Sequence, residues 1–267
     1  MASVASLSNK SAALVRTQVC SILRRHCLVG ASTMSTRTNS LANQRIAGIV
    51  FDMDGTLSIQ NLDFDEMYRL AGVPKDKDIL TEIKKMSPER AAEASRVVQE
   101  IEADGARTMQ LMPGVIQCFQ HLATKDVKLA LVTRNSTDTV LEFYRRLWLP
   151  AGLPPFSPAI SRDGEVLPPD QHLISARPSV NLTNLPPKPD PGAFFAIAEY
   201  WQLERGNHLV MVGDSPGHDI AFGVAAGATT VLIDVDGSAS TKVKPHSTPD
   251  FVVQDWSEMT SLFSSHL

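Results

Sequence analysis

The sequence has no long apolar run, although 43% of its 267 residues are hydrophobic. No stretch approaches the roughly 20 consecutive apolar residues that a transmembrane helix needs, so we expect no membrane span. Cysteine is scarce, with three residues in the chain. An odd cysteine count without metal-binding spacing is typical of a reducing compartment and argues against a disulfide framework. We therefore expect a globular chain with a sizeable apolar core.

Acidic residues are missing before Asp52, a region that holds six basic residues and many serines, threonines and alanines. An arginine-rich, acid-free start is typical of an organelle transit peptide. We expect residues 1–44 to direct the protein to the mitochondrion, with a plastid as the second choice. The alternatives are a disordered basic tail on a cytoplasmic protein, or translation from Met34.

Basic residues are the minority after this leader, where 19 of them face 29 acidic residues and the net charge is −10. Nucleic acids need lysine and arginine to neutralise their phosphates, and no basic stripe is present. We therefore expect neither a nucleic acid nor a membrane as partner.

Strands and helices alternate along most of the chain, which predicts an α/β fold with a parallel, doubly wound, Rossmann-like sheet. In such a sheet, ligands bind beyond the carboxyl ends of the strands. Near-continuous apolar runs, typical of strands buried on both faces, lie at 46–51, 127–133, 208–213 and 229–235. Helices are predicted at 113–124, 137–147, 191–203, 219–226 and 257–263, with a last short strand at 251–253. We expect this core to comprise residues 45–57 and 109–267.

Two segments interrupt the alternation. Residues 58–108 are highly charged and helical in pattern, which predicts a small all-helical insert with helices at 63–71, 76–86 and 88–103. Residues 150–191 hold 11 of the 17 prolines and are expected to be loop, with a short strand at 159–161. Within them, 163–184 is expected to be a disordered insertion without a role, or else a loop over the site.

Polar residues with a common chemistry follow the predicted strands. Two carboxylates, Asp52 and Asp54, come directly after the first strand, and Asp214 follows a later one. A carboxylate can attack phosphorus and form an aspartyl-phosphate, and carboxylate oxygens also bind Mg²⁺. The attack needs positive charge nearby, which Lys188 supplies, and the Thr133 hydroxyl can bind phosphoryl oxygens. The pattern predicts phosphoryl transfer on a small phosphorylated metabolite.

Four segments resemble, in order, the motifs of the haloacid dehalogenase-like (HAD) hydrolase superfamily. They are Asp-Met-Asp-Gly-Thr-Leu at 52–57, Leu-Val-Thr-Arg-Asn at 131–135, Lys-Pro-Asp-Pro at 188–191 and Val-Gly-Asp-Ser-Pro-Gly-His-Asp at 212–219. The resemblance covers roughly residues 46 to 235. The helical insert at 58–108 matches the place where this family carries a small cap over its site.

The resemblance implies catalytic roles at the matching positions. Asp52 is expected to be the nucleophile and a metal ligand. Asp54 is expected to be the acid for the leaving group and then the base for water, with its backbone carbonyl on the metal. Thr133 and Lys188 are expected to bind and neutralise the phosphoryl group. The presence of Asp54 favours a phosphatase over a dehalogenase.

The resemblance also implies metal and substrate ligands. Asp214 is expected to bind Mg²⁺, and Asp219 either binds it or orients another ligand. Asp219 is alternatively an acidic residue at the start of a helix, where the helix dipole favours it. Substrate contacts are expected from Gly55, where the backbone can approach the phosphate, and from Thr56, Arg134 and Asn135. Arg134 either reaches a second anionic group of the substrate or points outward.

The predicted function is Mg²⁺-dependent hydrolysis of a small phosphomonoester through an aspartyl-phosphate. One alternative is a phosphomutase of the same superfamily, which needs a cap that excludes water well. The other is a non-catalytic binding protein with the same fold. The retained Asp52, Asp54, Lys188 and Asp214 argue against the binding protein.

Overall fold

The computed structural model describes residues 45–167 and 180–267. The predicted leader and residues 168–179 of the predicted insertion lie outside this range. Among the described residues, none of the helices has the length and apolar content to cross a membrane.

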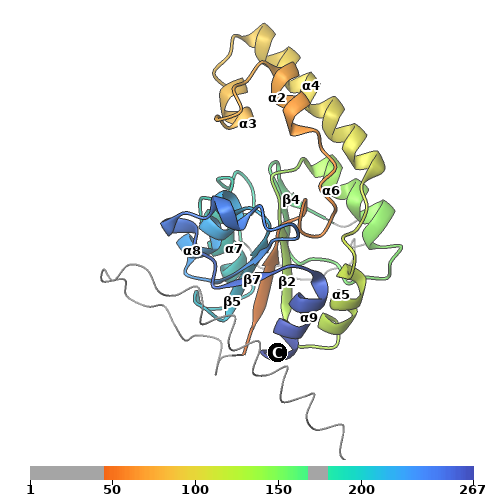
Figure 1. The fold of residues 1–267 in the computed structure, drawn as a ribbon, viewed down its shortest axis with the longest axis vertical. Coiled ribbons are helices and arrows are strands. Elements are labelled where there is room, and N and C mark those ends of the chain that lie inside the picture. Colours follow the sequence, from red (N-terminus) through yellow and green to blue (C-terminus); the bar gives the residue numbers. More distant parts are fainter. Residues whose placement is uncertain (1–44, 168–179) are drawn as a thin grey trace, which may run out of the picture. The chain divides into compact units, whose positions relative to one another are not determined.

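The described strands form one sheet in the order β4-β3-β2-β1-β5-β6-β7, and every neighbouring pair except β3 with β4 is parallel (Figure 1). The chain builds one half of the sheet outward from β1 and then returns to β1 to build the other half. This is the doubly wound topology that the alternation predicted. The strands are β1 (Gly48–Phe51), β2 (Lys128–Val132), β3 (Ala159–Ser161), β4 (Gly164–Val166), β5 (Leu209–Gly213), β6 (Thr229–Ile233) and β7 (Phe251–Val253).

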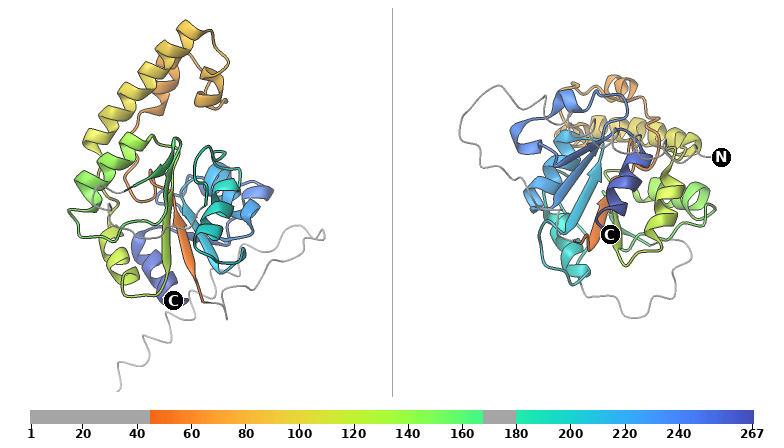
Figure 2. Two further views of the ribbon diagram at one scale, coloured as in Figure 1. Left: turned by 180° about the vertical axis from the view of Figure 1, so that it is seen from behind. Right: turned by 60° about the horizontal axis from the view of Figure 1, so that its bottom comes forward.

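Helices cover both faces of the sheet because its central strands are apolar on both sides. Along β1, Ile49 and Phe51 point into the core shared with α5, α6 and α9. Val50 points into the opposite core. The helices α7 and α8 lie on that face of the sheet (Figures 1 and 2) and complete this core. These helices are α5 (Val115–Leu122), α6 (Thr137–Phe143), α7 (Gly192–Tyr200), α8 (Ala221–Ala226) and α9 (Trp256–Ser264). Single π-helical turns at Tyr144–Trp148 and Pro216–Ile220 adjoin α6 and α8, and 3₁₀ turns lie at Ser240–Lys242 and Pro245–Ser247.

The proline-rich segment contains a strand that the sequence analysis missed. β4 follows β3 after a tight turn and pairs with it in the antiparallel direction, with Ser161 opposite Gly164. The predicted parallel sheet thus has one antiparallel strand at its edge, and the prediction of a structureless stretch from residue 163 is wrong for residues 164–166. The strand is three residues long and carries no apolar alternation, so periodicity could not reveal it.

Three helices lie between β1 and α5, and we call this segment, residues 58–108, the cap. They are α2 (Phe64–Ala71), α3 (Ile79–Ile83) and α4 (Pro88–Thr108). Asp63 and Asp78 accept hydrogen bonds from amides in the first turns of α2 and α3, which fixes where these helices begin. The helices enclose a small apolar core of their own around Met67, Ile79 and Val98.

Candidate active site

Three neighbouring strands bring the predicted site residues together. β2, β1 and β5 lie side by side, and their carboxyl ends lead into Thr133, Asp52 and Asp214. The backbone N–H of Asp52 still donates to Val212 of β5 at 2.9 Å, so the sheet itself holds the start of this loop. The site therefore lies where the strand order reverses, as expected for a doubly wound sheet.

Lys188 enters this group from the loop before α7 and is buried, with 4% of its surface exposed. Its ammonium donates to Asp52 Oδ1 at 2.5 Å, to Asp219 Oδ1 at 2.7 Å and to the carbonyl of Val132 at 2.9 Å. An ammonium has three donors, and all of them are used here. Lys188 is therefore a buried, fully bonded residue of the site and not a solvated loop lysine.

The buried charges shift one another's titration. Burial tends to lower the pKa of Lys188, but the charges of Asp219 and then Asp52 outweigh it and raise that pKa to about 12. Burial raises the pKa of Asp52 well above its usual value; the charge of Lys188 opposes this, and the carboxylates of Asp219 and Asp214 add to it. Burial, followed by the charge of Asp219, raises the pKa of Asp214 to about 7. When all three carboxylates are ionised, the group carries more negative charge than the single ammonium of Lys188 balances.

The donor set suits a divalent cation. Asp52, Asp214 and Asp219 each offer a carboxylate oxygen, and these three oxygens lie within 4.8 Å of one another. Hard cations such as Mg²⁺ bind this kind of oxygen cluster, and the excess negative charge favours one. Asp219 is 2% exposed and its second oxygen accepts the N–H of Ser215 at 3.0 Å, so it is fixed in place.

Two glycines allow the carboxylates to pack this closely. A Cβ built at Gly213 would overlap the side chain of Asp219, and one built at Gly55 would overlap the carboxylate of Asp214. Gly55 also has a φ of +74°, which other residues rarely adopt. Gly55 is predicted to let the backbone approach the phosphate, and the structure shows a further reason for a glycine here, which is the room it leaves for Asp214.

Asp54 is held by two side-chain donors. Ser58 Oγ donates to one of its oxygens at 2.9 Å and Asn135 Nδ2 to the other at 2.6 Å. Burial raises the pKa of Asp54, and the bonds from Asn135 and Ser58 limit the rise. A carboxyl group with a raised pKa and a fixed orientation suits proton transfer. The role of Ser58 was missed, because a lone serine after the first motif gives no signal.

A cavity of about 370 Å³ lies over these residues, between the carboxyl ends of the strands and the cap. The predicted site residues that line it are Asp52, Asp54, Thr133, Arg134, Asn135, Lys188, Asp214 and Asp219. Thr56 lies elsewhere: its side chain is fully buried, and its carbonyl accepts the indole N–H of Trp256 at 3.1 Å. The structure therefore does not place the side chain of Thr56 in the cavity with the other predicted residues.

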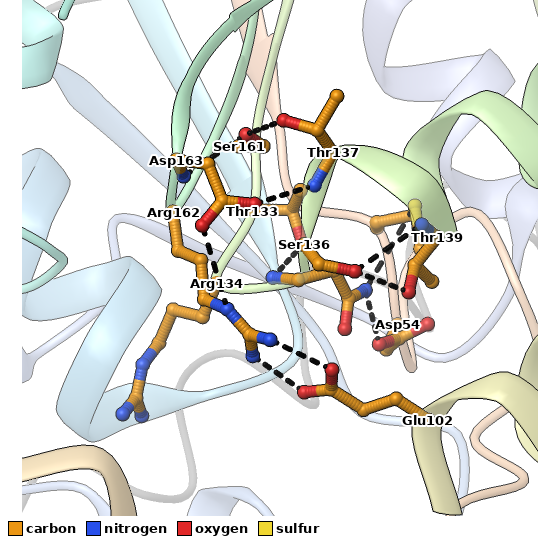
Figure 3. A network of polar contacts seen from close by, with 12 residues as sticks. Asp54, Glu102, Thr133, Arg134, Ser136, Thr137, Thr139, Ser161, Arg162 and Asp163 are labelled. Carbon is orange, nitrogen blue, oxygen red and sulfur yellow. Dashed lines mark hydrogen bonds and ion pairs between the residues drawn. The ribbon is translucent and has the colours of Figure 1, made fainter. Parts of the chain in front are cut away.

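Two core arginines at the cavity pair with cap carboxylates. Arg134 forms an ion pair with Asp78, and its Nη1 lies 3.1 Å from His218 Nε2. Arg162 donates both terminal nitrogens to Glu102 of α4, at 2.5 and 2.8 Å (Figure 3). Sequence reasoning missed Arg162 and Glu102, which are 60 residues apart and belong to no motif.

Comparison with known proteins places the chain in a family. A haloacid dehalogenase-like hydrolase domain-containing protein of Arabidopsis thaliana is 31% identical over 266 residues, which cover 95% of this chain and 96% of that protein. Residues 186–259 match the HAD-hydrolase-like family. The fold is a doubly wound α/β sheet with a cluster of carboxylates at its carboxyl edge. The chain belongs to the haloacid dehalogenase-like hydrolases, as its motifs predicted.

Solved structures share the fold. An HAD-hydrolase of Bacillus subtilis, in a crystal form bound to magnesium, aligns with a TM-score of 0.54 and 19% identity over 82% of this chain and 99% of that one. A predicted phosphoglycolate phosphatase of Haemophilus somnus aligns with a TM-score of 0.56 and 18% identity over 83% and 99%. At such identities the likeness concerns the fold alone.

Proposed function

We propose that this hydrolase is a Mg²⁺-dependent phosphatase that hydrolyses phosphomonoesters through an aspartyl-phosphate on Asp52. The observation that carries the proposal is the contact of Lys188 with Asp52 and Asp219 at one edge of the cavity. The lysine holds the nucleophile in place and offers positive charge where a phosphoryl group would bind. The magnesium-bound and phosphatase structures of the same fold add support.

The chain's own residues account for both halves of the reaction. Asp52 attacks phosphorus, and the bond from phosphorus to the leaving oxygen breaks as Asp54 gives that oxygen a proton. Asp54 then takes a proton from water, the water oxygen attacks the aspartyl-phosphate, and Asp52 is released with inorganic phosphate. Thr133 binds a phosphoryl oxygen in both steps, and Lys188 places its positive charge beside the phosphoryl group. Mg²⁺ held by Asp52, Asp214 and Asp219 would supply further positive charge to the phosphoryl group.

The test is phosphate release from an aryl phosphate, with and without Mg²⁺, by the wild type and by Asp52→Asn. We expect magnesium-dependent release that disappears in Asp52→Asn. Asp126→Asn changes a carboxylate that is 99% exposed, and this control should keep full activity. Equal release by the wild type and Asp52→Asn would contradict the proposal.

We also propose that residues 1–44 act as a mitochondrial transit peptide. The support is the missing acidic residues and the arginine content of this segment. A fluorescent protein fused to residues 1–50 should reach mitochondria. Retention of the fusion in the cytosol would overturn this proposal.

A further inference from the structure

The cap gives the catalytic cavity an apolar wall. Six of its side chains line the cavity and define what we call the cap wall: Leu62, Phe64, Met67, Ile79, Leu80 and Val98. The other cap residues at the cavity are Gln60 and Tyr68, which are uncharged, and Glu102. The Tyr68 hydroxyl already donates to the carbonyl of Lys77 at 2.9 Å. A leaving group that extends from the phosphoryl site into the cavity therefore meets carbon surface on the cap side.

Each lysine or arginine side chain that lines the cavity pairs with at least one carboxylate. Within the described residues, Lys188, Arg134 and Arg162 are the lysine and arginine side chains that line it. Lys188 is surrounded by Asp52 and Asp219 in the phosphoryl site. Arg134 and Arg162 are paired with cap carboxylates.

Each of these two ion pairs is stabilised in its own way. The side chains of Glu102 and Arg162 are 10% and 19% exposed, and two parallel hydrogen bonds join them. A substrate anion that replaced Glu102 as the partner of Arg162 would leave the Glu102 carboxylate desolvated and unpaired. The carboxylate of Asp78 is also held by a second contact, because it accepts the N–H of Thr81 at 2.9 Å and so caps the N-terminus of α3. A second anion on the substrate would meet two arginines whose charges these carboxylates already neutralise.

We propose that the cavity selects phosphomonoesters whose leaving alcohol is uncharged and apolar, such as an alkyl or benzyl group, over those that carry a carboxylate or a second phosphate. The proposal rests on the phosphatase function proposed above and names its substrate class. In this proposal, Arg134 holds α3 near the cavity through its ion pair with Asp78 and does not bind a second anionic group of the substrate. The cavity volume of about 370 Å³ falls within the usual range for small-molecule sites.

A matched pair of esters tests the preference. Para-methylbenzyl phosphate and para-carboxybenzyl phosphate have similar size, and their methylene group insulates the leaving oxygen from the substituent. We expect kcat/KM to be at least about tenfold higher for the methyl compound, the scale on which apolar pockets discriminate small changes. Phosphoglycolate should also be a poor substrate. Equal or faster hydrolysis of para-carboxybenzyl phosphate by the wild type would overturn the inference.

A lysine placed in the cap wall should reverse the preference. Phe64 is 44% exposed and lines the cavity, so Phe64→Lys adds an uncommitted cation at little cost to folding. It should raise kcat/KM for the carboxylate ester relative to the methyl ester by about tenfold. Leu70 lies on the same helix, is 46% exposed and is not among the cavity residues, so Leu70→Lys is the matched control. The ratio of kcat/KM for the carboxylate ester to kcat/KM for the methyl ester should not change in Leu70→Lys. An equal change of this ratio in both variants would contradict the role of the cap wall.

The outcomes separate this inference from the phosphatase proposal. If no ester of either kind shows hydrolysis that depends on Asp52, the phosphatase function fails and the inference fails with it. If Asp52-dependent hydrolysis is present but the carboxylate ester is preferred, the phosphatase function stands and only the inference fails.

Discussion

Gly55 lies directly against the carboxylate of Asp214, so that a Cβ at position 55 would overlap the Asp214 oxygens. The two residues come from the loops after β1 and β5, which are neighbouring strands. Only a residue without a side chain allows the loop after β1 and the carboxylate after β5 to approach this closely. The geometry of the proposed metal site thus depends on a position that bears no functional group.

Gly55→Ala should remove activity by displacing Asp214. Gly237 provides a matched control, because its φ of +78° is nearly the same as the +74° of Gly55 but no atom lies within 4 Å of a Cβ built there. Both variants should lose about 1 kcal/mol of stability from backbone strain. Phosphatase assays and urea unfolding should show that only Gly55→Ala also loses most of its activity. Full activity in Gly55→Ala would contradict the crowding seen at Asp214.

Lys188→Met should reduce both activity and stability. The loss of a preorganised positive charge should lower kcat by at least about 100-fold. It also leaves Asp52 and Asp219 buried without their partner, which should cost about 3 kcal/mol at neutral pH. Adding Asp219→Asn should restore part of the stability, measured by chemical unfolding, without restoring activity. A Lys188→Met protein as stable as the wild type would show that the ammonium does not hold this site together.

The metal-free protein should lose stability with rising pH because of Asp214. Its pKa is raised from 3.8 to about 7 in the folded protein, so the folded state favours the neutral acid. The contribution of Asp214 to stability is therefore full below about pH 3.8 and is lost as the pH rises through about 7. In EDTA, the free energy of unfolding of the wild type should decrease over this pH range by up to about 4 kcal/mol relative to that of Asp214→Asn.

Magnesium should reverse this loss. Thermal unfolding at pH 7 should show a higher Tm for the wild type when Mg²⁺ is added, because a cation that binds the folded state stabilises it. Asp214→Asn should show a smaller gain. If Mg²⁺ raises the Tm of both proteins equally, Asp214 does not contribute to the metal site.

Glu102→Gln should destabilise the protein because it leaves Arg162 without its partner in a partly buried position. The expected cost is about 3 kcal/mol, measured by urea unfolding. Glu93 lies on the same helix and pairs with Arg96 in the solvent, where both side chains are more than half exposed. Exposed pairs contribute little, so Glu93→Gln should leave the unfolding midpoint nearly unchanged. Equal effects of the two substitutions would show that burial of the Glu102 pair is unimportant.

The sequence predicted the centre of the fold well because its signals are local. The run before Asp52 and the run before Asp214 are apolar on both faces, and such runs form central parallel strands. Once these strands are neighbours, the residues that follow them must meet at one edge of the sheet. The positions of the motifs at the strand ends were therefore enough to predict that Asp52, Thr133 and Asp214 lie close together.

The sequence did not predict contacts that depend on distant segments. Asp78 and Arg134 are 56 residues apart, and neither position shows that the other is its partner. For this reason the sequence allows two roles for Arg134, and only the structure shows its ion pair with Asp78 at the start of α3. Thr56 was assigned to the substrate because it belongs to the first motif, yet the turn after Asp54 directs it into the core.

The most direct test of the account is detection of a phosphoryl group on Asp52. Asp54→Asn lacks the base for the second step, and an aryl phosphate has a good leaving group that does not need the proton of Asp54 in the first step. The covalent enzyme should therefore accumulate after this variant is mixed with an aryl phosphate and Mg²⁺. Acid quenching and mass spectrometry should find one added phosphoryl group on the peptide that contains Asp52. The same peptide of Asp52→Asn should stay unmodified. Phosphate release by the wild type without any phosphorylated Asp52 in either the wild type or Asp54→Asn would contradict the proposed mechanism.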